Sequence, residues 1–222
     1  MKKIIALTAL AITVVMFSFT KTETVPVQRD FKIAEAQYSA MIFNVKRFDE
    51  YPRTALPDGT LKNTDLQEWT SGFWPGSLWY LYEYTKDEKW KAAATRWTNT
   101  LAANQYNKTT HDLGFMMYCS YGNAYRLTGD KEYRDILIQS AKSLATRFDA
   151  RVGCIRSWDP RLSWDGKTTW QFPVIIDNMM NLELLFFASK ESGDPTYRNI
   201  AITHAETTMK NHIRPDFSSY HV

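Results

Sequence analysis

One pattern occurs three times in the sequence, as Asp87-Glu88-Lys89-Trp90-Lys91, as Asp130-Lys131-Glu132-Tyr133-Arg134 and as Asp194-Pro195-Thr196-Tyr197-Arg198. Each copy has an aspartate, an aromatic residue three positions later, a basic residue, and then a run that suits a helix. The aspartate is typical of an N-cap, because its carboxylate can accept hydrogen bonds from the free N–H groups of the first helical turn. Proline directly after Asp194 suits the first helical position. Each copy therefore predicts the start of a helix.

A more apolar helix is expected before each of these starts. The three segments are Ser77–Tyr84, Phe115–Leu127 and Met179–Ala188, and they are apolar on most sides, as buried helices are. The helices that follow, such as Lys89–Ala103, keep a polar face and suit an outer layer. An apolar stripe of helical period predicts one further helix over about Asp30–Phe48. Helical hairpins repeated every 40 to 60 residues or so predict an all-α fold, either an open α-solenoid or a closed α/α toroid.

The first 20 residues have the features of a secretory signal. Lys2 and Lys3 precede an apolar stretch from Ile4 to Phe19, which is short for a membrane span and has no basic stop-transfer cluster behind it. We therefore expect residues 1–20 to be a signal peptide, residues 28–222 to form one domain, and the protein to be secreted or periplasmic.

The composition excludes several classes of protein. The chain has 27 basic and 24 acidic residues, and removing the two lysines of the signal leaves 25 against 24, a net charge of +1. Such a balance gives no electrostatic support for a nucleic-acid or polybasic membrane partner. Two cysteines, Cys119 and Cys154, exclude a disulfide-rich miniature domain, although a single bridge between them stays open. The four histidines have no metal-binding spacing.

Residues that do not suit packing lie at the starts of the inner helices. The three stretches are Glu68–Gly76 (EWTSGFWPG), His111–Phe115 (HDLGF) and Ile175–Leu182 (IIDNMMNL). Trp69 lies 18 residues before its outer-helix aspartate (87 − 69), Asp112 lies 18 before (130 − 112), and Asp177 lies 17 before (194 − 177). Equivalent positions of a repeat lie at the same end of the assembly. These three side chains are therefore expected at one mouth, with His221 of Ser218–His221 as a fourth candidate.

Each candidate residue has a structural alternative. An aspartate at a helix start is usually a cap, which is the simpler interpretation of Asp112. Asp177 lies between apolar residues, and burial of a carboxyl raises its pKa and keeps a proton available for general acid catalysis. His111 and His221 could bind substrate or serve as satisfied structural residues, whereas His204 and His212 are assigned to structure or solvent.

Several tryptophans are candidates for carbohydrate contacts. Trp90 and Trp97 lie seven residues apart on one outer helix and are expected to pack. Trp158, Trp164 and Trp170 lie in the loop from residue 149 to 173, the longest connection in the chain, which is too long for a simple turn. These three could stack on sugar faces or pack against the protein.

Five motifs together resemble the unsaturated glucuronyl hydrolases, glycoside hydrolase family 88. They are WTSGFWPG at Trp69–Gly76, HDLGF at His111–Phe115, IIDNMMNL at Ile175–Leu182, GDPTYR at Gly193–Arg198 and SSYH at Ser218–His221. The resemblance implies an (α/α)6 barrel, of which this chain, with about seven helices, would hold the N-terminal portion. The rest of the barrel is expected to follow Val222, so activity of these 222 residues alone is in question.

The resemblance also implies a reaction and a site. Members of this family remove a 4,5-unsaturated glucuronic acid from the non-reducing end of lyase-generated oligosaccharides by hydrating the C4=C5 vinyl ether. By similarity, Asp177 is the general acid/base and Asp112 the second essential carboxylate. Trp69, His111 and His221 resemble substrate-contacting positions, and no metal or organic cofactor is implied.

Three alternatives stay open. An unsaturated rhamnogalacturonyl hydrolase has the same fold and chemistry but acts on pectin fragments, and the HDLGF form of the motif favours the glucuronyl class. A secreted helical-repeat glycan-binding protein without catalysis would use its aspartates only as caps. A sugar isomerase or epimerase on the same toroid usually relies on histidine pairs, and the two aspartates argue against it.

Overall fold

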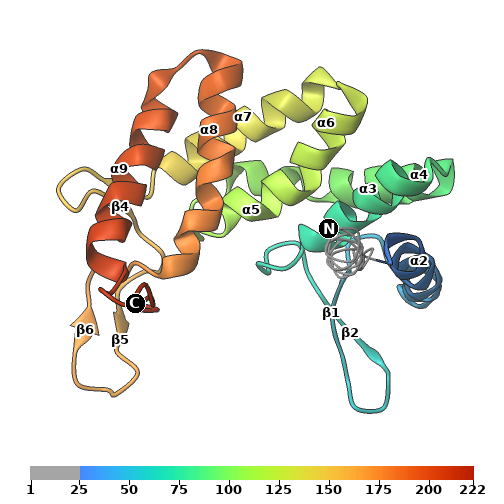
Figure 1. Cartoon of the computed structure of the whole chain (residues 1–222), viewed down its shortest axis with the longest axis horizontal. Coiled ribbons are helices and arrows are strands. Elements are labelled where there is room, and N and C mark those ends of the chain that lie inside the picture. The colour runs from blue at the N-terminus through green and yellow to red at the C-terminus, as the bar shows by residue number, and fades with distance from the viewer. Residues whose placement is uncertain (1–25) are drawn as a thin grey trace, which may run out of the picture. The chain divides into compact units, whose positions relative to one another are not determined.

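The structure, a computed structural model, describes residues 26–222 (Figure 1), so the predicted signal over residues 1–20 lies outside the described residues. The chain divides into two units between Ala34 and Glu35. The described part of the first unit is mainly the beginning of helix α2 (Val27–Asn44), and every other element belongs to the second unit. Among the described residues, no helix has both the length and the apolar character that a membrane span needs.

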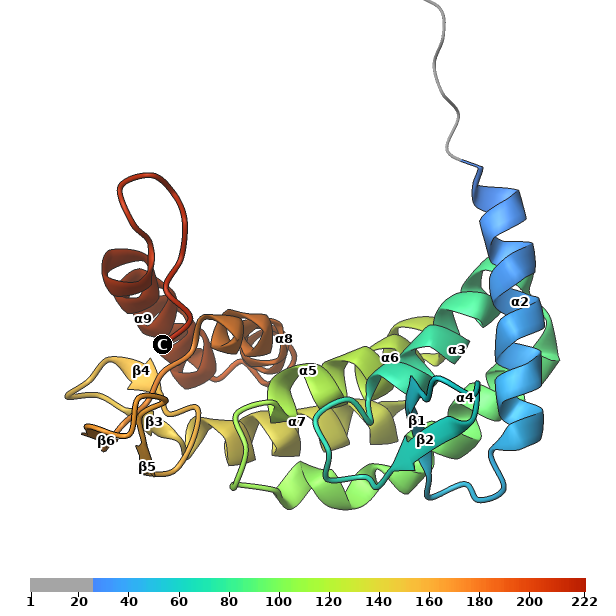
Figure 2. The ribbon, with the colours of Figure 1, turned by 90° about the horizontal axis from the view of Figure 1, so that it is seen from below.

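Three inner–outer helical hairpins form the second unit, as predicted. They are α3 (Phe73–Thr85) with α4 (Glu88–Thr100), α5–α6 (Leu113–Met117 and Asn123–Thr128) with α7 (Lys131–Ala145), and α8 (Leu182–Ser192) with α9 (Pro195–His212). A single π-helical turn, Tyr118–Gly122, makes α5 and α6 one continuous inner helix. Figures 1 and 2 show the second hairpin between the other two.

The predicted N-caps are confirmed. Asp87 accepts from the backbone N–H of Lys89 at 3.0 Å, and Asp130 accepts from that of Glu132 at 2.9 Å. Asp194 does the same for Thr196 at 2.8 Å. The residue before each aspartate has a left-handed backbone, with φ of 58°, 72° and 76° at Lys86, Gly129 and Gly193. This residue ends the inner helix and the aspartate begins the outer one, so two residues suffice for each turn.

Glycines in the motifs bring the inner helices into backbone contact. A Cβ atom on Gly76 would lie 2.7 Å from the carbonyl oxygen of Cys119. A Cβ atom on Gly114 would lie 2.5 Å from Cα of Asn181, in the 3₁₀ turn Ile176–Asn181 that precedes α8. Neither position has room for a side chain, so the glycines set how closely neighbouring inner helices approach.

The opposite ends of the inner helices are joined by polar contacts. Arg126 of α6 binds Glu83 of α3 with two hydrogen bonds, of 2.6 and 2.7 Å. The hydroxyl of Tyr125 donates to Glu191 of α8 at 3.1 Å. The Arg126 and Glu83 side chains are 47% and 37% exposed, so water and ions reach this pair.

The predicted packing of Trp90 and Trp97 is confirmed, since both are 1% exposed. Trp90 donates its indole N–H to Glu35, and Trp97 donates to the carbonyl of Glu50. The predicted helix over Asp30–Phe48 ends four residues early, at Asn44, and Phe48 instead packs edge-on against Trp97 at 5.1 Å.

Three small antiparallel hairpins were not expected from the sequence. Their strands are β1 (Tyr51–Ala55) with β2 (Leu61–Thr64), β3 (Phe148–Asp149) with β4 (Cys154–Ile155), and β5 (Arg161–Leu162) with β6 (Thr169–Trp170). The last two pairs lie in the long loop over residues 149–173 or directly beside it.

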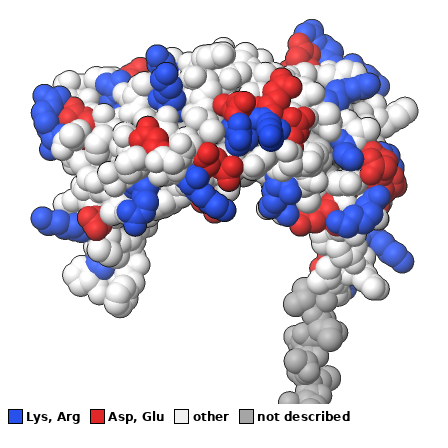
Figure 3. Space-filling view, turned by 90° about the horizontal axis from the view of Figure 1, so that it is seen from above, with Lys and Arg blue, Asp and Glu red and all other residues white. Residues whose placement is uncertain are grey.

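Cys119 and Cys154 are both free thiols, so the bridge that the sequence left open is not formed. Acidic and basic side chains are interspersed on the face shown in Figure 3, which agrees with the small net charge.

Candidate active site

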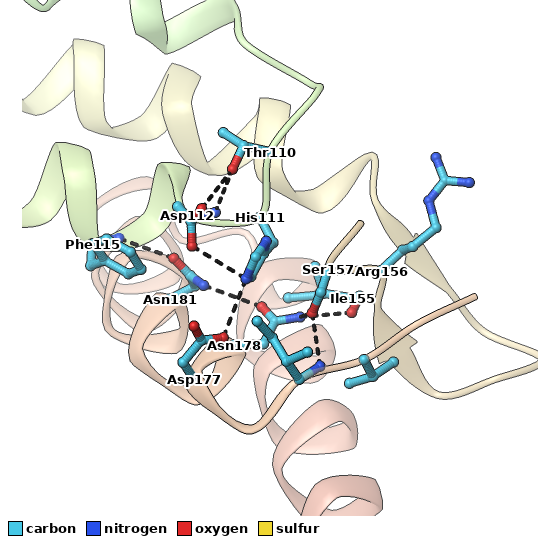
Figure 4. Close-up of polar contacts among 12 residues, drawn as sticks. Thr110, His111, Asp112, Phe115, Ile155, Arg156, Ser157, Asp177, Asn178 and Asn181 are labelled. Carbon is cyan, nitrogen blue, oxygen red and sulfur yellow. Dashed lines mark hydrogen bonds and ion pairs between the residues drawn. The ribbon is translucent and has the colours of Figure 1, made fainter. Parts of the chain in front are cut away.

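His111 joins the two predicted carboxylates. Its Nε2 atom lies 3.2 Å from Asp112 Oδ1 and 3.3 Å from Asp177 Oδ1 (Figure 4). The two aspartates come from separate helical hairpins, 65 residues apart in the sequence (177 − 112). The imidazole is 1% exposed, and the other ring nitrogen, Nδ1, is buried without a hydrogen-bond partner. The contact with Asp177 is a hydrogen bond, whereas Asp112 lies within ion-pair distance of the same nitrogen.

Asp112 does not cap its helix, although a cap was the simpler interpretation of the sequence. Its side chain makes no capping hydrogen bond and instead accepts from the Thr110 hydroxyl at 3.0 Å. Burial raises the pKa of Asp112, while His111 and the Thr110 hydrogen bond oppose the rise and the charges of Asp177 and Glu68 add to it. A carboxyl in this setting holds its proton to a higher pH than an exposed one.

Asp177 is the more accessible of the two carboxylates. It lies in the 3₁₀ turn Ile176–Asn181, and its side chain is 41% exposed against 16% for Asp112. The burial that the sequence suggested for Asp177 thus applies more strongly to Asp112. Asp177 is thus open to solvent at this end of the helices, while Asp112 is enclosed by protein atoms.

A buried amide network holds the two helix starts together. Asn181 accepts from the backbone N–H of Phe115 at 3.1 Å and donates to Asn178 at 3.2 Å. Asn178 donates to the carbonyl of Ile155 at 2.7 Å and to the hydroxyl of Ser157 at 3.3 Å. Both asparagines are fully buried, so the network fixes the distance between the strand-rich loop and the two aspartates (Figure 4).

Trp69 lies at the same end of the helices, as predicted. Its ring meets Phe115 edge-on at 6.2 Å, three residues after Asp112, and is 44% exposed. The guanidinium of Arg53 lies 5.1 Å over the indole and also binds Glu68 at 2.9 Å. Arg53 of strand β1 thereby holds the tryptophan from one side.

His221 also comes to this group. Its backbone carbonyl accepts from the N–H of Ile176 at 3.0 Å, next to Asp177. Its ring lies 6.3 Å from Trp158 and 6.1 Å from Trp164. The segment that carries His221 is not helical.

The loop tryptophans form an aromatic cluster that leads outward from the site. Trp158 lies 6.5 Å from His111 and 5.6 Å from Trp164, and Trp164 lies 4.9 Å from Trp170. Trp164 remains 58% exposed. The rings pack on one another, as one interpretation of the sequence expected, while stacking on sugar faces stays a prediction for the exposed surface.

The ligand atoms of His111, Asp112 and Asp177 lie within 4.8 Å of one another, a spacing that one cation could bridge. The two contacts of His111 Nε2 account for the same spacing, since 3.2 and 3.3 Å are hydrogen-bond distances. The expectation of a metal-free site therefore stays a prediction.

A concavity elsewhere in the unit has a different character. It has a volume of about 380 Å³ and lies among the inner helices, toward the end that holds Arg126 and Glu191. Its lining includes Glu183 and Glu191 together with Arg126, whose guanidinium is already paired with Glu83.

Sequence reasoning missed several residues that support the site. Thr110, Glu68, Ser157 and the two asparagines all contact it or shape its charge. Two of them had a visible signal, since Asn178 and Asn181 are amides three residues apart inside an apolar motif. Buried amides must find partners, so this spacing could have indicated a network.

The comparisons with known proteins agree on one family. The chain is 42% identical over 211 residues to an unsaturated glucuronyl hydrolase of Formosa agariphila, covering 91% of this chain and 52% of that protein. It is 35% identical over 185 residues to the unsaturated glucuronyl hydrolase of Bacillus sp. (strain GL1), covering 80% and 47%. The chain thus spans about half the length of the curated relatives it matches. No family model matches the chain.

Solved structures give the same result. A crystal structure of an unsaturated glucuronyl hydrolase specific for heparin aligns with a TM-score of 0.79 at 50% identity, over 87% of this chain and 50% of that one. That of the enzyme from Bacillus sp. GL1 aligns with a TM-score of 0.71 at 31% identity, over 83% and 48%.

Repeated inner–outer hairpins with acids at the inner-helix starts place the chain in the (α/α)6-barrel class of carbohydrate-active proteins. The chain contains only part of such a barrel. Within that class, the chain belongs to the unsaturated glucuronyl hydrolases, glycoside hydrolase family 88.

Proposed function

We propose that the protein carrying this chain removes a 4,5-unsaturated glucuronic acid from the non-reducing end of lyase-generated oligosaccharides. The observation that carries the proposal is the convergence of Asp112 and Asp177 on His111 from separate hairpins. Two carboxyl groups in unlike environments can divide the work of proton transfer between them.

The proposed reaction is hydration of the C4=C5 vinyl ether. Asp177, the more exposed acid, donates a proton to C4 and then takes a proton from the water that adds to C5. The product is a hemiketal, which opens to a ketone at C5, and the bond from C1 to the next sugar then breaks. The atoms of one water molecule are consumed overall, and Asp177 returns to its starting protonation state.

The remaining residues have supporting roles in this proposal. Asp112 is the second carboxylate, and its buried position beside Thr110 and His111 keeps the pair oriented. Trp69 and His221 contact the unsaturated ring and its neighbour. His111, which the sequence suggested as a substrate contact, is 1% exposed, so its main part here is to hold the two acids.

The substrate class is a glycosaminoglycan fragment. One relative at 50% identity is described as specific for heparin, and others at 34 to 36% identity are named unsaturated chondroitin disaccharide hydrolases. A further relative was solved with the ligand dGlcA-GalNAc6S. We place heparin-lyase disaccharides first, since the more similar relative acts on that glycan. The signal expected over residues 1–20 would direct the enzyme to the periplasm or the medium.

The test follows loss of the ultraviolet absorbance of the conjugated C4=C5 bond with unsaturated disaccharides from heparin, chondroitin and gellan. It is run on this chain and on any longer product of the same gene. We expect turnover by the longer product, and a loss of about 100- to 10,000-fold in kcat for Asp177→Asn with an unchanged circular dichroism spectrum. Absence of turnover with every uronyl disaccharide would refute the hydrolase.

Two rivals make different predictions in the same assay. A rhamnogalacturonyl hydrolase would turn over pectin-derived fragments and leave the glycosaminoglycan products intact. A glycan-binding protein without catalysis would leave the absorbance of every disaccharide unchanged, and its glycan binding would be unaffected by Asp112→Asn and Asp177→Asn.

A further inference from the structure

Arg147 is a buried cation between the loops that carry the candidate site. It lies directly after α7, and 5% of the residue is exposed. Burial lowers the pKa of its guanidinium, and the Arg156 charge adds to this, while Asp159 and Asp112 favour the charged form. A buried guanidinium is stabilised only when its donors find acceptors, so its partners indicate what it does.

Its partners are three backbone carbonyls from two loops. Nη1 donates to Lys108 at 2.8 Å, Nε donates to Arg156 at 2.8 Å, and Nη2 donates to Ser157 at 3.1 Å. The nearest carboxylate, on Asp159, is 3.9 Å away. The planar fork of an arginine suits such convergent acceptors, which a lysine could not satisfy together.

Each of these loops leads to one half of the site. Lys108 lies three residues before His111 and four before Asp112. On the other side, the hydroxyl of Ser157 accepts from the N–H of Ile175, two residues before Asp177, at 3.0 Å. A single guanidinium therefore connects the backbone that carries one acid to the backbone that positions the other.

We propose that Arg147 is a positioning residue that sets the register of Asp112 against Asp177 and Trp158 by binding both loops. This inference rests on the proposed function for its kinetic consequence, but the coupling of the loops does not depend on it. Without the guanidinium, the three carbonyls lose their common partner and the loop before His111 can shift relative to Ser157.

The test compares Arg147→Met and Arg147→Lys with the wild type. Arg151→Gln is the matched control, because Arg151 lies on the same loop, is fully solvated and binds only Asp149. In Arg147→Met we expect kcat per folded molecule to fall about 10- to 100-fold, since small displacements of reacting groups have effects of this size, with KM changed less than about threefold. Arg147→Lys keeps the charge but not the fork and should lie between the two, while Arg151→Gln should behave as wild type.

Amide hydrogen exchange provides a second readout that does not need turnover. We expect faster exchange in peptides covering residues 107–112 and 155–158 of the variants, with α3 and α4 unchanged. A uniform increase over the whole chain, or a wild-type kcat in folded variants, would overturn the positioning role. If Arg147→Met does not fold, Arg147→Lys decides the question by the same two measurements. If the longer product of the gene turns over no unsaturated disaccharide, the proposed function fails. Local or uniform exchange then still decides whether Arg147 couples the loops.

Discussion

Gly114→Ala should show how strictly the helix starts are spaced. The new Cβ would lie 2.5 Å from Cα, Cβ and Oδ1 of Asn181, a distance too short for atoms that are not covalently linked. Because the nearest atoms include backbone, rotation of the asparagine side chain cannot relieve the overlap. The start of α5 must therefore move away from the turn before α8.

The magnitude follows from two effects. Overpacking in a filled core costs about 1–3 kcal/mol, and the buried N–H of Phe115 would lose its acceptor on Asn181, which costs about 1–3 kcal/mol. A total of about 3 kcal/mol corresponds to a fall in Tm of about 6–12 °C for a domain of this size. The displaced α5 also carries Asp112 away from Asp177, so kcat should fall with stability.

Thermal unfolding followed by circular dichroism measures the first effect, and the vinyl-ether assay measures the second. Gly129→Ala is the control, since that glycine has φ of 72° and a Cβ atom added to it would have no neighbour within 4 Å. The substitution should lower the free energy of unfolding by about 1–2 kcal/mol through backbone conformation only. Gly129→Ala should lose stability but keep kcat. A Tm of Gly114→Ala within about 2 °C of wild type, with kcat unchanged, would refute the close-approach argument.

Three further predictions concern single side chains. The raised pKa of Asp112 means that the native state binds more protons than the unfolded chain above pH 3.8, so stability from this group is lost as the pH rises through the folded pKa. The difference in Tm between Asp112→Asn and wild type should therefore increase between pH 4 and 7 in favour of the variant. A difference that does not change with pH would contradict the burial of this acid. Burial lowers the pKa of His204 to about 4, and its neutral Nδ1 accepts from the N–H of Ile155 at 3.1 Å. About 3 kcal/mol of the free energy of unfolding should therefore be lost as the pH falls from 6.5 to 4. In calorimetry at several pH values, His204→Gln should lose less stability over this range, and an equal loss would assign the effect to other groups. Trp158→Ala should raise KM about tenfold or more with little change in Tm, as loss of a stacking surface does; an unchanged KM for every disaccharide would assign the ring to packing alone.

Local rules explain why the hairpins could be predicted from the sequence. The caps at Asp87, Asp130 and Asp194 depend only on the next two or three residues, and all three are formed. The grouping of Trp69, Asp112 and Asp177 followed from repeat spacing, which places equivalent positions at the same end.

Features that depend on contacts between hairpins could not be predicted. Asp177 is partly solvated, as its apolar neighbours in the sequence suggested, but the greater burial of Asp112 beside Thr110 and His111 had no signal in the sequence. The function of Arg147 depends on carbonyls 39, 9 and 10 residues away, and a lone arginine after a helix gives no such signal. The end of α2 at Asn44 was also missed, because the apolar stripe continues past it while the backbone turns.

The inner helices are fastened differently at their two ends. Glycine contacts and buried amides join the starts, whereas Arg126–Glu83 and Tyr125–Glu191 join the far ends in contact with water. Exposed ion pairs contribute about 0–1 kcal/mol and weaken with ionic strength, while packed backbone does not respond to salt in this way. High salt should therefore weaken the contacts between the far ends of the inner helices. The helix starts, and with them Asp112 and Asp177, should keep their positions at the same salt concentration.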